Sequence, residues 1–228
     1  MIWLAVWPSF AALSAVADWI GVGTCRPRLE YLAKPLTIVL LIAWLLSGSG
    51  VERALSLPTL LVLAALLFSL AGDILLMLPE ARFLPGLVLF LLAHLSYVLA
   101  FTWNRPQLMP GEWLLGAAIA FLLAAVLPPV RAGLRRSGRS GLVGPVAAYA
   151  LVLGAMLWAS VGTLLHPSWL AAGATWVALG GLAFFASDVS LVWDRFVAPL
   201  PGRRVTTHAL YHLGQLALTG GVLSAASG

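Results

Sequence analysis

The chain has 228 residues, of which 61% are hydrophobic and only 9% are charged, and it carries a formal net charge of +5. This composition excludes an ordinary water-soluble domain and predicts a polytopic membrane protein. A spanning helix needs about 20 mostly apolar residues, so the length leaves room for seven or eight spans and no sizeable soluble domain. The single cysteine, Cys25, excludes internal disulfides and a thiolate metal cluster.

Eight apolar segments follow one another along the chain. Their unbroken Leu, Ala and Val runs lack the alternation of a membrane β-barrel, so we expect an all-α bundle of eight transmembrane helices in one domain, residues 1–228. The first segment lacks the basic start and the cleavage pattern of a signal peptide, and we expect it to be retained. The approximate ranges are 2–20, 35–48, 56–78, 83–103, 112–130, 142–164, 169–190 and 205–225.

Positive charge is distributed unevenly over the predicted loops. Only Arg53 and Arg105 lie in the even-numbered loops, whereas eleven of the thirteen Lys and Arg residues lie in or beside the odd-numbered ones. The positive-inside rule therefore predicts cytoplasmic odd loops and two external termini, in what we expect to be a bacterial inner membrane. The eleven are Arg26, Arg28, Lys34, Arg82, Arg131, Arg135, Arg136, Arg139, Arg195, Arg203 and Arg204.

The arginine cluster between Arg131 and Arg139 has two interpretations. Basic clusters can bind nucleic acid, but this one lies directly beside two predicted spans. There it is typical of a topology signal that also contacts anionic membrane lipids. We therefore expect membrane lipid rather than nucleic acid as the partner of this cluster.

Two aspartates lie inside otherwise apolar segments. Asp73 and Asp188 are near the predicted cytoplasmic ends of the third and seventh spans. A carboxylate at membrane depth costs roughly 3 kcal/mol on insertion scales, so a functional role is the first hypothesis. Lys34 and His208 lie near the cytoplasmic starts of the second and eighth spans. The four side chains should therefore converge on one half of the membrane.

Helical spacing places further polar side chains on common faces. Such faces cannot contact lipid, and together they would line a largely apolar cavity with a few polar groups, which is the usual composition of a small-molecule site. The faces consist of His208, Tyr211, His212, Gln215 and Thr219 in the last span, Phe83, Phe90, His94, Tyr97 and Phe101 in the fourth, and Tyr149, Met156 and Ser160 in the sixth.

Each candidate also has a purely structural interpretation. The two aspartates could pair with Lys34, Arg82 or Arg195 and only lock the bundle together. Tyr97, Tyr211 and Gln215 could form interhelical hydrogen bonds. His208 and His212 have the i, i+4 spacing of a metal pair, but no third ligand is evident, so we expect no metal. The tryptophans near the predicted interfaces are interpreted as the aromatic belt; they are Trp3, Trp7, Trp19, Trp103, Trp113 and Trp169.

The two halves of the chain resemble one another. In each half an aspartate near the end of one span is followed, 20 or 21 residues later, by His-x-x-Tyr in the next span. Because both aspartate-bearing spans run in the same direction, this indicates a parallel repeat of four plus four helices, about 1–105 and 110–228, with chance coincidence as the alternative. The matching sets are Asp73, His94 and Tyr97, and Asp188, His208 and Tyr211.

Short motifs along nearly the whole chain resemble the YhhN, or lysoplasmalogenase-like, family of integral membrane proteins. One departure is His212, where a tyrosine is common in the family. The motifs are Lys34-Pro35-Leu36-Thr37, Gly72-Asp73-Ile74-Leu75-Leu76-Met77-Leu78-Pro79 with Phe83, Gly86, Phe90, His94 and Tyr97, then Tyr149 with Met156, Phe184-Phe185-Ala186-Ser187-Asp188 with Arg195-Phe196, and Tyr211-His212-Leu213-Gly214-Gln215.

This resemblance implies hydrolysis of the vinyl-ether bond of lysoplasmalogens, giving a fatty aldehyde and glycerophosphoethanolamine or glycerophosphocholine. The expected partners are a lysophospholipid substrate and membrane lipids, and no cofactor is expected. We predict that Asp73 and Asp188 form a catalytic carboxylate pair, with His208 tuning or relaying protons. The predicted substrate-binding residues are Lys34, which would hold the phosphate, together with His94, Tyr97, Tyr149, Tyr211 and Gln215.

Two other functions fit the same features. A proton-coupled transporter or flippase of small amphiphiles would also carry one intramembrane carboxylate in each half. Such a carrier should place its acids near the midplane, whereas the predicted acids cluster toward one side. A structural partner of another membrane protein would instead bury the polar face of the last span against a second chain.

Overall fold

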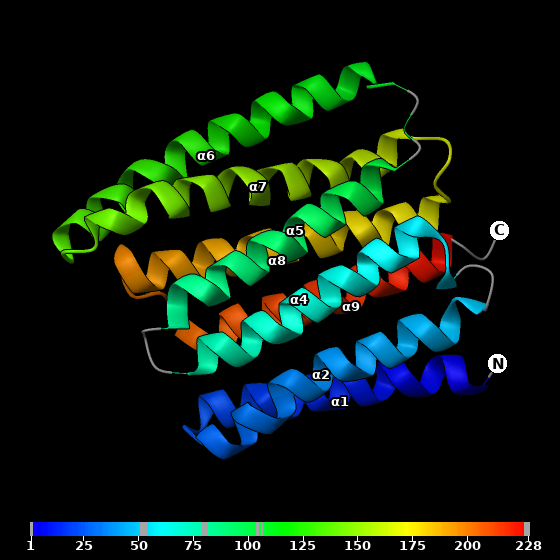
Figure 1. Cartoon of the computed structure of the whole chain (residues 1–228), viewed down its shortest axis with the longest axis horizontal. Helices are drawn as coiled ribbons and strands as arrows, with labels where there is room; N and C mark the ends of the chain where they lie inside the picture. The colour runs from blue at the N-terminus through cyan, green and yellow to red at the C-terminus, as the bar shows by residue number, and fades with distance from the viewer. Residues whose placement is uncertain (1, 51–53, 79–81, 104, 106, 226–228) are drawn as a thin grey trace.

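A computed structural model describes residues 2–50, 54–78, 82–103, 105 and 107–225 of the chain (Figure 1). Within these residues the protein contains eight long helices and no strand, as the sequence predicts. The helices are α1 (Ile2–Gly23), α2 (Pro27–Gly48), α4 (Leu57–Met77), α5 (Phe83–Thr102), α6 (Pro110–Arg136), α7 (Val143–Gly162), α8 (Ala171–Phe196) and α9 (Arg203–Ala225).

The helices run alternately up and down, and Figure 1 shows both chain termini at one end of the bundle. The connections α1–α2, α6–α7 and α8–α9 gather at the opposite end, which we call the basic end. Arg26, Arg139 and Arg204 lie in or beside these connections. The first, fifth and seventh loops therefore lie at one end, as predicted. Residues 79–81 of the third predicted loop, including Pro79, lie outside the described residues.

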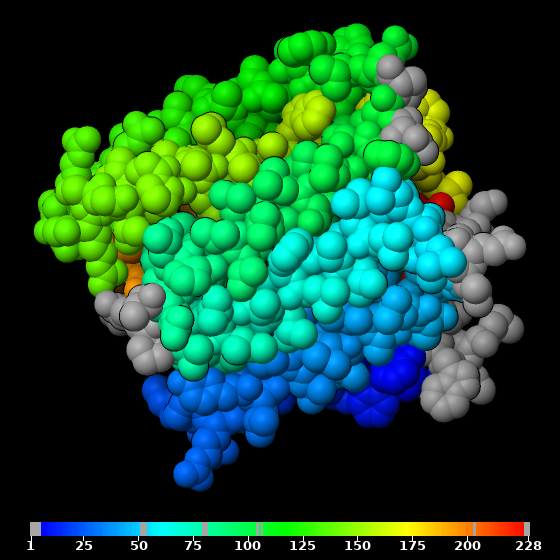
Figure 2. Space-filling model, in the orientation of Figure 1, coloured from blue at the N-terminus to red at the C-terminus, as the bar shows by residue number. Residues whose placement is uncertain are grey.

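Seven of the eight helices are long and apolar enough to cross a membrane, which makes the protein a multi-pass integral membrane protein. The eighth helix, α9, is less hydrophobic than the other seven because polar residues interrupt its apolar sequence. It contacts α1, α2 and α8 inside the bundle. Apolar side chains such as Leu67, Leu95 and Phe121 are exposed on the outside. Figure 2 shows one such face, in which α2, α4 and α5 lie side by side.

Three helices extend further into the basic end than their apolar segments predict. The largest difference is at α2, which begins at Pro27 rather than near residue 35. Proline is favoured in the first helical turn, and Arg, Glu and Lys are good helix formers. Their charge only lowers the hydropathy of the first two turns, so that these turns do not look like part of a membrane span. Lys34 therefore lies two turns inside α2, where its side chain can reach α4. Similarly, α6 continues to Arg136 and α8 to Phe196.

Small residues bring α8 and α9 into close contact. A Cβ atom added at Gly180 would lie 2.7 Å from the backbone nitrogen of Leu218, and one at Gly214 would lie 3.0 Å from that of Phe184. Such small-residue contacts are a common way for membrane helices to associate. These contacts fix α9 against the helix that carries Asp188.

A buried polar cluster lies near the start of α6, at the end opposite to the basic end. The Glu112 carboxylate accepts hydrogen bonds from Arg105 Nη1 at 2.6 Å and from His166 Nε2 at 2.9 Å. Arg105 also donates to the carbonyl oxygen of Ala159 at 2.5 Å. Burial lowers the pKa of Arg105 from its usual value, and the Glu112 carboxylate opposes this shift. The cluster joins the α5–α6 connection to the end of α7.

Candidate active site

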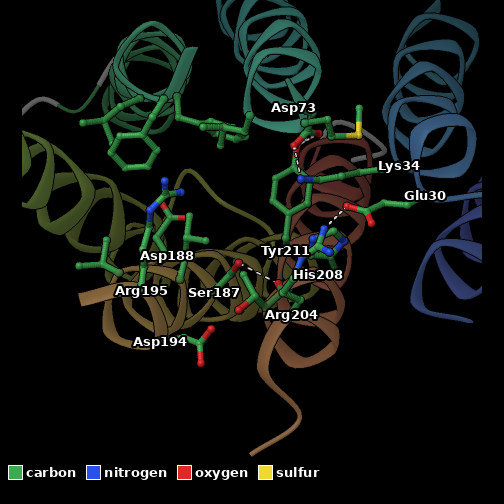
Figure 3. A pocket seen from close by; sticks show the side chains of 18 of the residues that line it. Glu30, Lys34, Asp73, Ser187, Asp188, Asp194, Arg195, Arg204, His208 and Tyr211 are labelled. Atoms are coloured by element: carbon green, nitrogen blue, oxygen red, sulfur yellow. Dashed lines mark hydrogen bonds and ion pairs between the residues drawn. The ribbon is translucent and has the colours of Figure 1, made fainter. Parts of the chain in front are cut away.

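A cavity of about 480 Å³ opens among α2, α4, α5, α7, α8 and α9 at the basic end (Figure 3). This volume is within the range of small-molecule sites in proteins. Its apolar part is formed by Leu76, Met77, Leu78, Phe83, Leu87, Phe90, Leu191 and Val192. Its polar part consists of Glu30, Lys34, Asp73, Tyr149, Ser187, Asp188, Asp194, Arg195, Arg204, Thr207, His208 and Tyr211. The predicted convergence of Asp73, Asp188, Lys34 and His208 is therefore observed.

Asp73 is completely buried and is held from two other helices. The Lys34 ammonium lies 2.9 Å from its Oδ1 atom, and the Tyr211 hydroxyl donates to its Oδ2 atom at 2.7 Å (Figure 3). Pairing with an ammonium group favours the ionised carboxylate. The lysine pairing proposed as a purely structural role thus exists, but both partners line the cavity.

Asp188 has different surroundings. The Tyr149 hydroxyl donates a hydrogen bond to Asp188 Oδ2. The Nε2 atom of His94 lies 3.5 Å from the same oxygen. Among the residues that the structure describes, no Lys or Arg forms an ion pair with Asp188, in contrast to Asp73. Of the two aspartates predicted to act as a pair, only Asp73 is therefore balanced by a full positive charge.

The hydrogen bonds of His94 determine how it can interact with Asp188. Its Nδ1 atom is 2.5 Å from the carbonyl oxygen of Phe90, which can only accept, so we assign a proton to Nδ1. In the neutral ring Nε2 is then an acceptor, and it faces a carboxyl oxygen. Among the described residues Nε2 has no hydrogen-bond partner, so this 3.5 Å contact leaves room for a proton on the Asp188 carboxyl group or on His94. His94 itself lies behind the cavity wall, 1% exposed.

His208 lines the cavity from α9 and is held from behind by α1. Its Nδ1 atom lies 2.7 Å from Oδ2 of Asp18, a fully buried residue. Sequence reasoning missed Asp18, although a carboxylate within the first apolar segment is the same signal that identified Asp73. Trp19, interpreted from the sequence as part of the interfacial aromatic belt, also has a partner inside the bundle: its Nε1–H donates to His212 Nδ1 at 3.1 Å.

Tyr97 and Gln215 lie behind the cavity instead of lining it. The Tyr97 hydroxyl donates to Gln215 Oε1 at 2.5 Å, and the Gln215 amide donates to Ser69 Oγ at 3.0 Å. All three residues are fully buried. The chain of hydrogen bonds connects α5, α9 and α4, so a contribution of Tyr97 and Gln215 to substrate binding would be made through the position of Tyr211.

Charged side chains of both signs surround the mouth of the cavity. Arg204 forms an ion pair with Glu30, and the Arg195 guanidinium lies 4.3 Å from the centre of the Phe83 ring. Figure 3 shows Glu30, Arg195, Arg204 and Asp194 around the same pocket. A mouth with cations and carboxylates beside an apolar interior suits an amphiphile with a charged head group.

The described residues contain no group of three or more His, Cys, Asp or Glu side chains that could hold a metal ion. The two histidines with metal-like spacing have other partners. His208 binds Asp18, and His212 binds Trp19. The arrangement can instead donate, accept and relay protons around a small apolar chamber.

Comparison with known proteins places the chain in a family. The model of the YhhN family matches residues 29–222. The human lysoplasmalogenase TMEM86B is 34% identical over 181 residues, which cover 77% of this chain and 66% of the human protein. The rat lysoplasmalogenase TMEM86B is 35% identical over 191 residues, covering 82% and 69%. A lysoplasmalogenase from Mycobacterium tuberculosis is 29% identical over 186 residues, covering 78% and 66%.

No solved structure matches this chain significantly. The chain spans about two thirds of the length of the human relative. The family match itself includes α2 to α9 and therefore every residue that lines the cavity. The protein thus belongs to the YhhN family.

Proposed function

We propose that the protein is a lysoplasmalogenase, which hydrolyses the vinyl-ether bond of a lysophospholipid to a fatty aldehyde and a glycerophospho-alcohol. The observation that carries this proposal is that two carboxyl groups from distant segments, Asp73 and Asp188, line one cavity in unlike surroundings. Unlike surroundings allow one carboxyl group to donate a proton while the other stays ionised. The lysoplasmalogenase activity named for the relatives supports the same conclusion.

The chemistry of a vinyl ether requires this division of roles. Proton transfer to the β-carbon converts the double bond into an oxocarbenium ion, which water then attacks. We assign the transferable proton to the Asp188–His94 pair, because this pair has no Lys or Arg partner among the described residues and therefore suits the donor. The ionised Asp73 suits stabilisation of the cation, as a carboxylate does in glycosidases.

The two ends of the cavity suit the two ends of the substrate. The aliphatic and aromatic side chains around Leu87 and Phe90 would hold the alkenyl chain. Lys34 and Arg204 line the cavity, where a head-group phosphate would compete with Asp73 and Glu30 for them. The cavity opens at one end of the bundle and not at its middle, which favours an enzyme over an alternating-access carrier.

We expect aldehyde release from a lysoplasmalogen and none from the matched 1-O-alkyl lysolipid. The alkyl ether has the same shape and head group, but it has no double bond to protonate. Purified protein in detergent micelles would be incubated with each lipid, and the aldehyde would be measured by a coupled dehydrogenase. Cleavage of both lipids, or of neither, contradicts the proposal; translocation of intact lipid in proteoliposomes without aldehyde would support the carrier instead.

We also infer that the basic end faces the cytoplasm of a bacterial inner membrane, so that both termini lie outside. Cys25, the single cysteine, is exposed in the α1–α2 connection at this end. In right-side-out spheroplasts, a membrane-impermeant maleimide should label Cys25 only after permeabilisation. The matched control combines Cys25→Ala with Gln107→Cys, an exposed position at the other end, and should react without permeabilisation. The reverse pattern would contradict this orientation.

A further inference from the structure

Asp18 on α1 forms a second buried carboxylate contact beside the cavity. It is 0% exposed, and its Oδ2 atom lies 2.7 Å from Nδ1 of His208. Its Oδ1 atom has no hydrogen-bond partner among the described residues. The family model begins at residue 29, so α1 and Asp18 lie outside the matched region. A carboxylate buried in the first membrane helix is costly and requires an explanation.

The contact determines which nitrogen of His208 is available. A carboxylate accepts the proton of Nδ1, which leaves Nε2 as the acceptor of the neutral ring. His208 lines the cavity, and with Nδ1 engaged by Asp18, Nε2 is the nitrogen that a ligand there can reach.

The neighbouring residue on α1 holds the other histidine of α9. Trp19 Nε1–H donates to His212 Nδ1 at 3.1 Å, so that nitrogen must accept and His212 is neutral. The His212 Nδ1 atom is also 3.8 Å from Asp18 Oδ2. Asp18 and Trp19 therefore hold two histidine rings of α9 in different tautomers: Nδ1 donates in His208 and accepts in His212. Of these two histidines, only His208 lines the cavity and can accept a proton from a ligand there.

We propose that Asp18 is a positioning residue, which holds His208 with Nε2 toward the cavity so that His208 acts as the base for the attacking water. This inference rests on the proposed hydrolase function. After the Asp188–His94 pair has protonated the β-carbon, water forms a bond to the α-carbon and gives one proton to His208 Nε2. Asp18 stabilises the resulting imidazolium.

The remaining steps return every catalytic group to its starting protonation state. The hemiacetal breaks its bond between the α-carbon and the glycerol oxygen, and that oxygen takes the proton from His208. The hemiacetal hydroxyl gives its proton to the Asp188–His94 pair as the aldehyde forms. The sum is one vinyl ether plus one water giving one aldehyde and one alcohol, with no oxidant or cofactor consumed.

A double-mutant cycle separates positioning from simple packing. With a lysoplasmenylethanolamine as substrate, we expect Asp18→Asn to lower kcat about 10- to 100-fold with KM changed by less than about 2-fold. His208→Asn should lower kcat about 100-fold or more. Adding Asp18→Asn to His208→Asn should then lower kcat by no more than about 2-fold, because Asp18 acts only through His208.

Ser14 provides the matched control, because it lies one turn before Asp18 and donates a buried hydrogen bond to the carbonyl oxygen of Ala33 on α2. Ser14→Ala should lower stability in detergent without changing kcat. An unchanged kcat in Asp18→Asn, or equal losses from this substitution in both backgrounds, overturns the inference while leaving the hydrolase function standing. No aldehyde from the unmodified protein overturns both.

The histidine tautomer gives a readout that does not depend on activity. The chain has four histidines, so ¹⁵N-histidine labelling with His208→Asn as the reference identifies the His208 signal by difference. We expect the proton on Nδ1 and a bare Nε2 in the unmodified protein. In Asp18→Asn the amide NH₂ can face Nδ1, so the proton should move to Nε2. A proton on Nε2 in the unmodified protein overturns the inference.

Discussion

Asp188→Asn is expected to lower kcat on a lysoplasmalogen by about 10²- to 10⁴-fold, the usual contribution of a general acid. Asparagine keeps the volume of aspartate and can still accept the hydrogen bond of Tyr149, but it cannot give up a proton to carbon. Helix content and melting temperature should therefore stay close to those of the unmodified protein. The measurement is the rate of aldehyde release in micelles, with circular dichroism to follow folding.

Ser190→Ala is the control for this experiment. Ser190 lies on the same helix, and its hydroxyl donates only to the carbonyl oxygen of Ala186. Its removal should leave kcat within about 2-fold, as expected for a surface-type substitution. An active Asp188→Asn would refute the paired-acid scheme. Asp73→Asn should also abolish hydrolysis, because it removes the negative charge beside the oxocarbenium ion and leaves Lys34 without its partner.

Glu112→Ala is expected to destabilise the folded protein by about 3–5 kcal/mol, the usual cost of removing one partner from a buried ion pair. Arg105 and His166 would both lose their carboxylate, and a guanidinium would stay buried without a counter-charge. The cluster lies away from the cavity, so kcat of the folded fraction should be unchanged. Thermal unfolding in detergent, with residual activity measured below the transition, tests both parts.

Thr175→Ala is a suitable control for stability, because its exposed hydroxyl bonds only to its own helix. Its effect should be within about 0.5 kcal/mol. A melting temperature for Glu112→Ala equal to that of this control would show that the Glu112 cluster does not hold α6 and α7 together. A loss of kcat at full stability would instead connect the cluster to catalysis.

The fold was largely predictable from sequence because its strongest determinants are local. Apolar segments of the right length give the eight helices, and the charge of the loops gives the end at which alternate connections gather. The start of α2 was missed by eight residues, since Arg28, Glu30 and Lys34 resemble a loop when only hydropathy is considered. The parallel repeat of two halves remains a prediction.

The residues of the candidate site were predictable only where the identity or spacing of residues within one helix was informative by itself. An acid in an apolar segment identified Asp73 and Asp188, and helical spacing identified the buried face of α9. Partners between helices depend on rotation and depth, which a single sequence does not encode. The contacts of Tyr149 with Asp188 and of Asp18 with His208 were therefore not predicted. For the same reason Tyr97 and Gln215 were expected at the cavity, although they pair with each other behind it.

The modest hydropathy of α9 has a consequence for biosynthesis. This segment is synthesised after the other seven described helices, and it is less apolar than they are. Its glycines pack closely against those of α8, and its polar side chains hydrogen-bond to residues of α1 and α4. Entry of α9 into the bilayer should therefore wait for the earlier seven helices to offer a binding groove. Insertion of this helix and completion of the cavity would then be a single event.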